Sequence, residues 1–75
     1  MAETRTLTKR LTKRNSRLAL GQHEFHAGGG MMLKMWQDWV PGRVEYDLFG
    51  EPLFFPLGED KPIRDLPGRE AKIWE

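Results

Sequence analysis

Cysteine is absent from this sequence, and serine occurs only once, at Ser16. The first absence excludes disulfides and thiolate zinc sites, and the second leaves a single serine hydroxyl that could act as a nucleophile. A chain of 75 residues without such cross-links has a core worth only about 3–5 kcal/mol. Association with a partner is the remaining means of stabilisation, so the composition favours a protein that works inside a larger assembly.

Long apolar runs are also missing. No segment approaches the roughly 18–20 consecutive apolar residues that a membrane-spanning helix requires, so we expect no membrane span. The N-terminal segment carries basic residues, and no apolar stretch follows them, which is unlike a secretion signal. The sequence therefore favours an intracellular or virion location.

The small net charge of +1 conceals a strong division along the chain. Residues 1–20 contain six basic side chains against Glu3 alone, so 6 − 1 = +5. Residues 21–75 contain six basic and ten acidic side chains, so 6 − 10 = −4. This division predicts a basic arm attached to an acidic body, an arrangement that suits partners of mixed charge.

Residues 1–20 contain the tetrad Leu-Thr-Lys-Arg twice in succession, at 7–10 and 11–14. Six cations are interleaved with three leucines, which is too little apolar content to offset the entropy of ordering. We therefore expect an extended arm that becomes ordered only on a partner, either protein subunits or nucleic acid. The predicted partner-binding residues are Arg5, Leu7, Lys9, Arg10, Leu11, Lys13, Arg14, Arg17 and Leu18 of the arm, with Trp39 and Trp74 of the body.

Residues 21–30 form a glycine-rich segment that predicts a hinge between the arm and the body. Within it, His23 and His26 are three residues apart, and Glu24 lies between them. Structural zinc normally needs four ligands, and no further ligand follows at a recognised spacing, so we expect no metal and no cofactor.

Residues 31–40 are the densest apolar block in the chain. Apolar side chains recur at i, i+3, i+4, i+7 and i+8, which is the stripe of an amphipathic helix, and Pro41 would end it. The stripe consists of Met32, Met35, Trp36, Trp39 and Val40.

Residues 43–57 alternate between apolar and acidic positions and then pass through a turn at 49–52, which predicts a β-hairpin with a short or edge second strand. Residues 58–68 would be irregular and extended, and residues 69–74 could form one last turn or strand at the end of this extended C-terminal segment. The predicted fold is therefore small α+β or largely irregular, with residues 31–75 as an aromatic-rich body. The expected core comprises Met32, Trp36, Val40, Val44, Tyr46, Leu48, Leu53 and Phe55.

The chain offers little catalytic chemistry. Its carboxylate pairs, Glu45 with Asp47 and Glu59 with Asp60, are better explained as a solvated strand face and a loop. A chain this short has little room for a preformed pocket, so we expect no enzymatic activity, no catalytic residue and no small-molecule substrate.

Two classes of function fit these observations. The first is a structural or accessory subunit of a larger assembly, such as a virion or capsid component. Its aromatic residues, prolines and charged arm suit a chain that extends along the surfaces of neighbouring subunits. The alternative is a small nucleic-acid-binding protein that grips phosphates with the arm. Against it, the body is acidic, and along the sequence the aromatic residues are not interleaved with cations.

Overall fold

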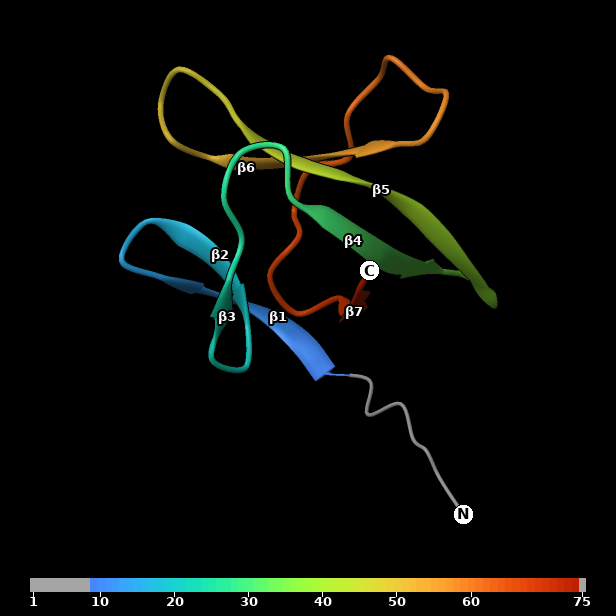
Figure 1. Ribbon diagram of the computed structural model, residues 1–75, viewed down its shortest axis with the longest axis horizontal. Coiled ribbons are helices and arrows are strands. Elements are labelled where there is room, and N and C mark those ends of the chain that lie inside the picture. The colour runs from blue at the N-terminus through green and yellow to red at the C-terminus, as the bar shows by residue number, and fades with distance from the viewer. Residues whose placement is uncertain (1–8, 75) are drawn as a thin grey trace.

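The computed structural model describes residues 9–74, and all of the regular structure within this range is β. Seven strands form one antiparallel sheet in the order β3-β2-β1-β7-β4-β5-β6 (Figure 1). The strands are β1 (Lys9–Arg14), β2 (Arg17–Leu20), β3 (His23–Glu24), β4 (Gly30–Met35), β5 (Asp38–Tyr46), β6 (Pro52–Pro56) and β7 (Glu70–Ile73). The predicted α+β class is therefore wrong.

The last strand occupies the centre of the sheet. Ala71 of β7 pairs with Lys9 of β1 on one side and with Leu33 of β4 on the other. Strand β7 thus joins two groups of three strands, β1 to β3 and β4 to β6 (Figure 1). Within the predicted extended C-terminal segment, where the sequence left a turn or a strand open, residues 70–73 form a strand, and its position inside the sheet was not predicted.

The helix predicted over residues 31–40 is instead a hairpin. Strands β4 and β5 pair from Gly30↔Arg43 to Met35↔Asp38 around a two-residue turn, Trp36-Gln37. Trp36 has a φ of +60°, the value that the first central residue of a type II′ turn requires. The spacing that resembled one helical stripe combines residues of two strands, and the turn between them carries no glycine that would reveal it.

Proline at position 41 does not end the element either. Pro41 lies within β5, and its carbonyl accepts the N–H of Leu57 at 2.9 Å, just beyond the end of β6. The missing N–H of proline therefore faces the place where the neighbouring strand stops, so no interior ladder bond is lost. Gly42 follows because a Cβ atom there would lie 2.3 Å from the carbonyl oxygen of Phe55.

The predicted arm is ordered over its described part. Residues 9–20 form the β1–β2 hairpin, with pairs from Leu11↔Leu20 to Arg14↔Arg17. Asn15 and Ser16 have φ values of +51° and +67°, which is the pattern of a type I′ turn, and asparagine tolerates this conformation well. Residues 1–8, which include the predicted sites Arg5 and Leu7, lie outside the described residues.

The hairpin expected over residues 43–57 corresponds to the pairing of β5 with β6, which extends from Gly42↔Pro56 to Tyr46↔Pro52. Strand β6 is the last in the sheet order and has a proline at each end. Beyond it, the N–H and carbonyl groups of Phe54 also bond to Ile63. This one bridge holds the long connection to β7 against the edge of the sheet.

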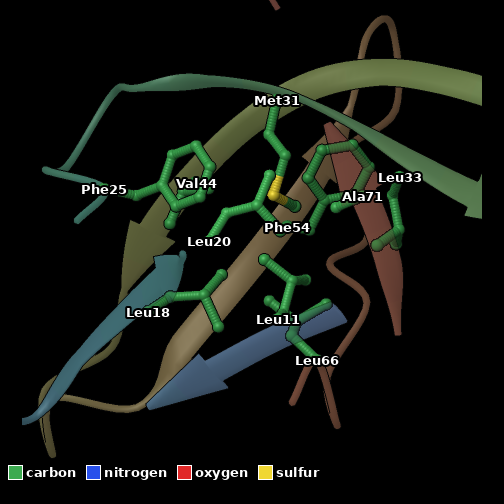
Figure 2. Close-up of a cluster of buried hydrophobic side chains, with 10 residues drawn as sticks. All are labelled: Leu11, Leu18, Leu20, Phe25, Met31, Leu33, Val44, Phe54, Leu66 and Ala71. Atoms are coloured by element: carbon green, nitrogen blue, oxygen red, sulfur yellow. The ribbon is translucent and has the colours of Figure 1, made fainter. Parts of the chain in front are cut away.

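The core lies on one face of the curved sheet and draws on nearly every strand (Figure 2). Its members are Leu11, Leu18, Leu20, Phe25, Met31, Leu33, Val44, Phe54, Leu66 and Ala71. Among the expected core residues, Val44 and Leu53 are buried, and Val40 and Tyr46 pack against the core. Met32 and Phe55 are only partly buried, Trp36 is 93% exposed and Leu48 is 100% exposed, so these four were assigned wrongly.

Tyr46 connects the two halves of the sheet through its hydroxyl group. The Tyr46 hydroxyl accepts the N–H of Leu18 at 3.0 Å and donates to the carbonyl oxygen of Phe25 at 2.6 Å. Close by, Val44 exchanges backbone hydrogen bonds with Gly28 and Gly29. The segment after β3 is thereby held against β5, and the sheet curls around its core.

Candidate interaction surfaces

The outer face of β4 to β7 carries cations and aromatic rings in alternation. Successive strand residues point to opposite faces, so Met31 and Leu33 enter the core while Met32 and Lys34 point outward. The strand register then sets outward residues of neighbouring strands side by side. We call the resulting group the cation–aromatic face, which consists of Lys34, Trp39, Arg43, Phe55, Lys72 and Trp74.

Trp39 is the centre of one half of this face. It lies opposite Lys34 in the β4–β5 register, and its ring centroid is 5.7 Å from the Lys34 Nζ atom. Lys72 reaches across from β7 to bring its Nζ atom within 4.4 Å of the same ring. Each cation is attracted to the negative face of the ring, and this attraction is worth about 0.5–1 kcal/mol at an exposed site.

The other half is built on the register Gly30↔Arg43↔Phe55. The Arg43 guanidinium carbon lies 4.7 Å from the centroid of the Phe55 ring, and the Arg43 Nε atom donates to Glu45 at 3.0 Å. A Cβ atom on Gly30 would lie 3.5 Å from the ring of Trp74. Trp74, which is 41% exposed, therefore lies beside Gly30 of β4 on the same face.

The charge of this face is weakly positive. Lys34, Arg43 and Lys72 oppose two outward carboxylates, Glu45 and Glu70. Glu70 lies 3.6 Å from Lys34 and 4.0 Å from Arg10 of β1. With Arg10 included the sum is 4 − 2 = +2, so the acidic character of residues 21–75 does not extend to this surface.

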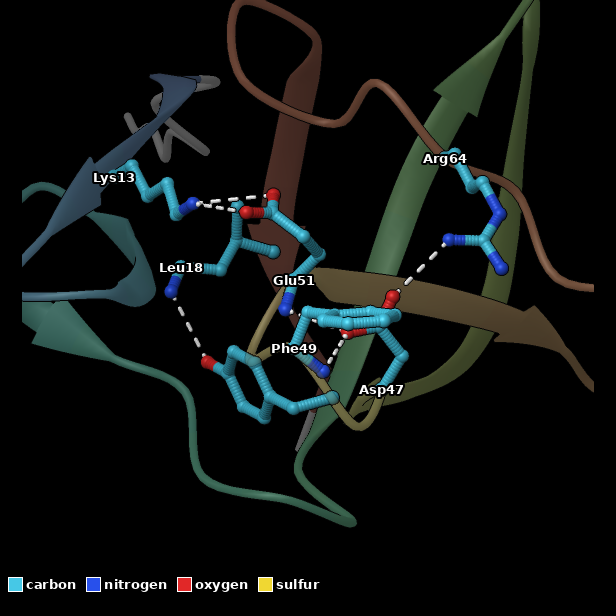
Figure 3. Close-up of polar contacts among 7 residues, drawn as sticks. Lys13, Leu18, Asp47, Phe49, Glu51 and Arg64 are labelled. Carbon is cyan, nitrogen blue, oxygen red and sulfur yellow. Dashed lines mark hydrogen bonds and ion pairs between the residues drawn. The ribbon is translucent and has the colours of Figure 1, made fainter.

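A second exposed feature is the turn between β5 and β6, where Leu48 is 100% and Phe49 is 89% exposed. Asp47 holds this turn, because its Oδ1 atom accepts the N–H groups of Phe49 and Glu51, both at 2.9 Å (Figure 3). Its Oδ2 atom lies 3.3 Å from Arg64. The Glu51 N–H lowers the pKa of Asp47 most, and the Phe49 N–H and Arg64 lower it further.

The predicted sites of the arm are divided between core and surface. Leu11 and Leu18 are 1% and 0% exposed, so their side chains are already used within the chain and are not accessible to a partner. Lys9 is exposed at the start of β1.

Four other cations of the predicted arm contact the chain itself. Lys13 pairs with Glu51 at 3.0 Å (Figure 3), and Arg10 donates to the carbonyl of Gly68 at 2.8 Å. Arg14 donates to the carbonyl of Gly21, and Arg17 contacts His26, each at 3.2 Å. The arm cations are therefore spread along the surface of a folded hairpin.

The predicted sites Trp39 and Trp74 lie together on the cation–aromatic face, whereas Lys34, Arg43, Phe55 and Lys72 were not predicted from the sequence. Strict alternation in residues 30–35 and 38–46 could have indicated this face, with Lys34 and Trp39 facing outward on either side of the turn. The contribution of Lys72 depends on a strand pairing more than 35 residues distant in sequence, which no local pattern reveals.

Residues 9–74 contain no cluster of three or more histidine, aspartate or glutamate side chains placed to hold a metal ion. His23 packs edge-on against Phe25, with ring centroids 4.7 Å apart. A shallow hollow of about 380 Å³ lies beside the β1–β2 turn, lined by Asn15, Ser16, Arg17, Ala27, Tyr46 and Gly50. This lining includes neither a carboxylate nor a histidine that could serve Ser16 as a base.

Comparison of the chain with protein-family models, with curated proteins and with solved structures gave no match. In the described part of the chain there is also no helix long and apolar enough to cross a membrane.

Proposed function

We propose that this chain is a non-enzymatic accessory subunit that attaches to a larger macromolecular assembly through its cation–aromatic face. The observation that supports the proposal is the gathering of three cations around the rings of Trp39 and Phe55, with Trp74 nearby, on the partly exposed outer face of the sheet. The function class is the one favoured by the sequence, which assigned the contact to the basic arm together with an aromatic surface that includes Trp39 and Trp74; the proposal places it on the sheet face that carries these two tryptophans.

The composition of the face favours a binding role over a merely solvated surface. The solvated side of an antiparallel sheet normally carries polar residues. Here Trp39, Phe55 and Trp74 leave ring surface partly accessible. Tryptophan, phenylalanine and arginine are enriched in the contact surfaces of proteins, whereas lysine, aspartate and glutamate are depleted, so the support comes from the rings and Arg43 and not from the two lysines. A small domain with a marginal core also gains stability when a partner binds only its folded form.

The test is the sedimentation of tagged full-length chain in an extract of the cells that produce it. We expect the wild-type chain to sediment with particles far larger than itself. The double variant Trp39→Ser, Phe55→Ser should be released to the position of the free chain, because both ring platforms are removed. The matched control is Leu48→Ser, Phe49→Ser, which removes two exposed apolar side chains from the turn outside the face and should remain with the particles.

Circular dichroism of each purified variant verifies that the fold is retained. Wild-type chain that sediments alone would contradict the proposal. So would a folded Trp39→Ser, Phe55→Ser variant that remains bound to the particles.

A further inference from the structure

We infer, on the basis of the proposed function, that the partner of the cation–aromatic face is a single-stranded nucleic acid. Bases would stack on Trp39 and on the paired Arg43 and Phe55, and phosphates would contact Lys34 and Lys72. Proteins that bind single strands without sequence preference combine a basic track with aromatic platforms. The structure supplies the interleaving of rings and cations that the linear sequence lacks.

The spacing of the two platforms suits a short strand. Trp39 and Arg43 are four residues apart on β5, which is about 13–14 Å at the rise of an antiparallel strand. Nucleotides stacked at about 3.4 Å each would cover this distance in about four nucleotides. Met32 and Pro41 pair between the two platforms and form a partly exposed apolar floor.

Lysine side chains now occupy the ring surface that a base would need. Lys72 lies 4.4 Å from the centroid of Trp39, so a stacking base must displace it. The contact of a cation with an exposed ring corresponds to a factor of about 2–5 in an equilibrium constant, whereas stacking of one base corresponds to about 5–150. Exchange is therefore favourable, and the displaced ammonium group gains a phosphate partner.

Other partners match fewer features of this face. An acidic protein would use the cations and would leave the three rings without a planar group to stack on. In a duplex the faces of the bases are already covered by their neighbours, so they are not available to stack on Trp39 or Phe55. A single strand alone offers both negative charge and accessible planar rings.

The experiment measures binding of the full-length chain to fluorescein-labelled dT12 and rU12 by fluorescence anisotropy. Unlabelled heparin, polyglutamate and a 12-base-pair duplex serve as competitors. We expect dT12 and rU12 to bind more tightly than every competitor. With Lys34 and Lys72 in contact with phosphates, log affinity should fall against log salt with a slope of about −1.4, which is two contacts at about 0.7 each. The two oligonucleotides differ in the 2′-hydroxyl and in the 5-methyl group of thymine, so unequal binding shows that one of these groups is recognised.

Variants separate stacking from charge. Trp39→Leu should weaken dT12 binding about 5- to 150-fold, whereas Trp39→Phe, which retains an aromatic ring, should weaken it less. Lys72→Ala should reduce the salt slope by about 0.7. Matched controls are Trp36→Phe at the exposed β4–β5 turn and Lys61→Ala in the loop after β6, which should bind as wild type. Thermal melting of each variant verifies folding.

The outcomes distinguish this inference from the proposed function. The inference is overturned if polyglutamate or heparin competes as well as dT12, if the chain does not bind dT12, or if folded Trp39→Leu binds as wild type. In each case the proposed function stands as long as the Trp39→Ser, Phe55→Ser variant is released from the sedimenting particles. Failure of that release overturns both.

Discussion

Replacement of Tyr46 by phenylalanine tests how the curled sheet is closed. The substitution removes one oxygen atom and keeps the ring that packs against the core. It deletes two hydrogen bonds, from the Leu18 N–H at 3.0 Å and to the Phe25 carbonyl at 2.6 Å. Both connect β5 to elements of the other half of the sheet, so their loss should loosen the closure specifically.

The expected loss of stability is about 2 kcal/mol. Each backbone group loses a partner in a partly buried position, which costs about 1 kcal/mol because water replaces the bond only in part. For a domain of this size, a change of 2 kcal/mol lowers the melting temperature by about 8–16 °C. With a urea m-value of about 1 kcal/mol/M, the unfolding midpoint should fall by about 2 M.

Urea unfolding and thermal melting followed by circular dichroism measure both quantities. The control is Trp36→Ala, which removes a larger side chain that is 93% exposed and should leave the melting temperature within a few degrees of wild type. If Tyr46→Phe melts within 2 °C of wild type, the hydroxyl does not hold the two halves together, and this account of the closure is wrong.

Two further substitutions probe the sheet and its β5–β6 turn. Gly42→Ala places a Cβ atom 2.3 Å from the Phe55 carbonyl oxygen and 2.6 Å from the Phe54 ring, so it should cost about 3 kcal/mol or more in urea unfolding. The control Gly58→Ala meets no atom within 4 Å and costs only the strain of alanine at a φ of +84°, about 1–2 kcal/mol, so equal losses from the two would refute the clash. Because hydrogen bonds and Arg64 lower the pKa of Asp47, its contribution to stability is present above the ordinary aspartate pKa and is lost as the pH falls through the depressed value. Asp47→Asn should therefore flatten the dependence of stability on pH below about pH 4, and an acid transition as steep as that of wild type would contradict this.

The helix predicted over residues 31–40 was wrong because the apolar spacing there has two possible interpretations. The helical spacing in residues 31–40 is a coincidence. Its members belong to two strands and to the turn between them, namely Met32 and Met35 of β4, Trp36 of the turn and Trp39 of β5. The turn itself gives little warning, since Trp36 takes a φ of +60° that glycine normally supplies. The fully buried residues of β4 are instead Met31 and Leu33. They are two residues apart, which is the spacing of one face of a strand.

Long-range pairing was the second obstacle. Residues 1–20 were expected to become ordered only on a partner, but residues 9–20 form the β1–β2 hairpin within the chain itself. They are ordered because Leu11 and Leu18 complete a core built by strands far along the chain. The turn at Asn15-Ser16 was not predicted, although asparagine permits a left-handed backbone and could have indicated it. The position of β7 between β1 and β4 could not have been predicted from any local pattern.

For the cation–aromatic face too, the local sequence indicated part of the surface and long-range strand pairing determined the rest. Trp39 and Trp74 were predicted as partner-binding residues from the sequence alone. That Lys72 reaches the ring of Trp39 follows from the pairing of β7 with β4. Although rings and cations are separated along the sequence, the fold therefore brings them into contact.

The central position of β7 also determines when the sheet can be completed. The β1–β2 and β4–β5 hairpins each close through two-residue turns, so they form over short chain distances and in microseconds. The ladder between the two halves has to wait for residues 70–73, and the pair Lys9↔Ala71 closes a loop of about 60 residues. On a ribosome the first hairpin would be exposed for most of synthesis with an unpaired β1 edge, and lysine and arginine at four of its six positions protect that edge from pairing with another chain in the meantime.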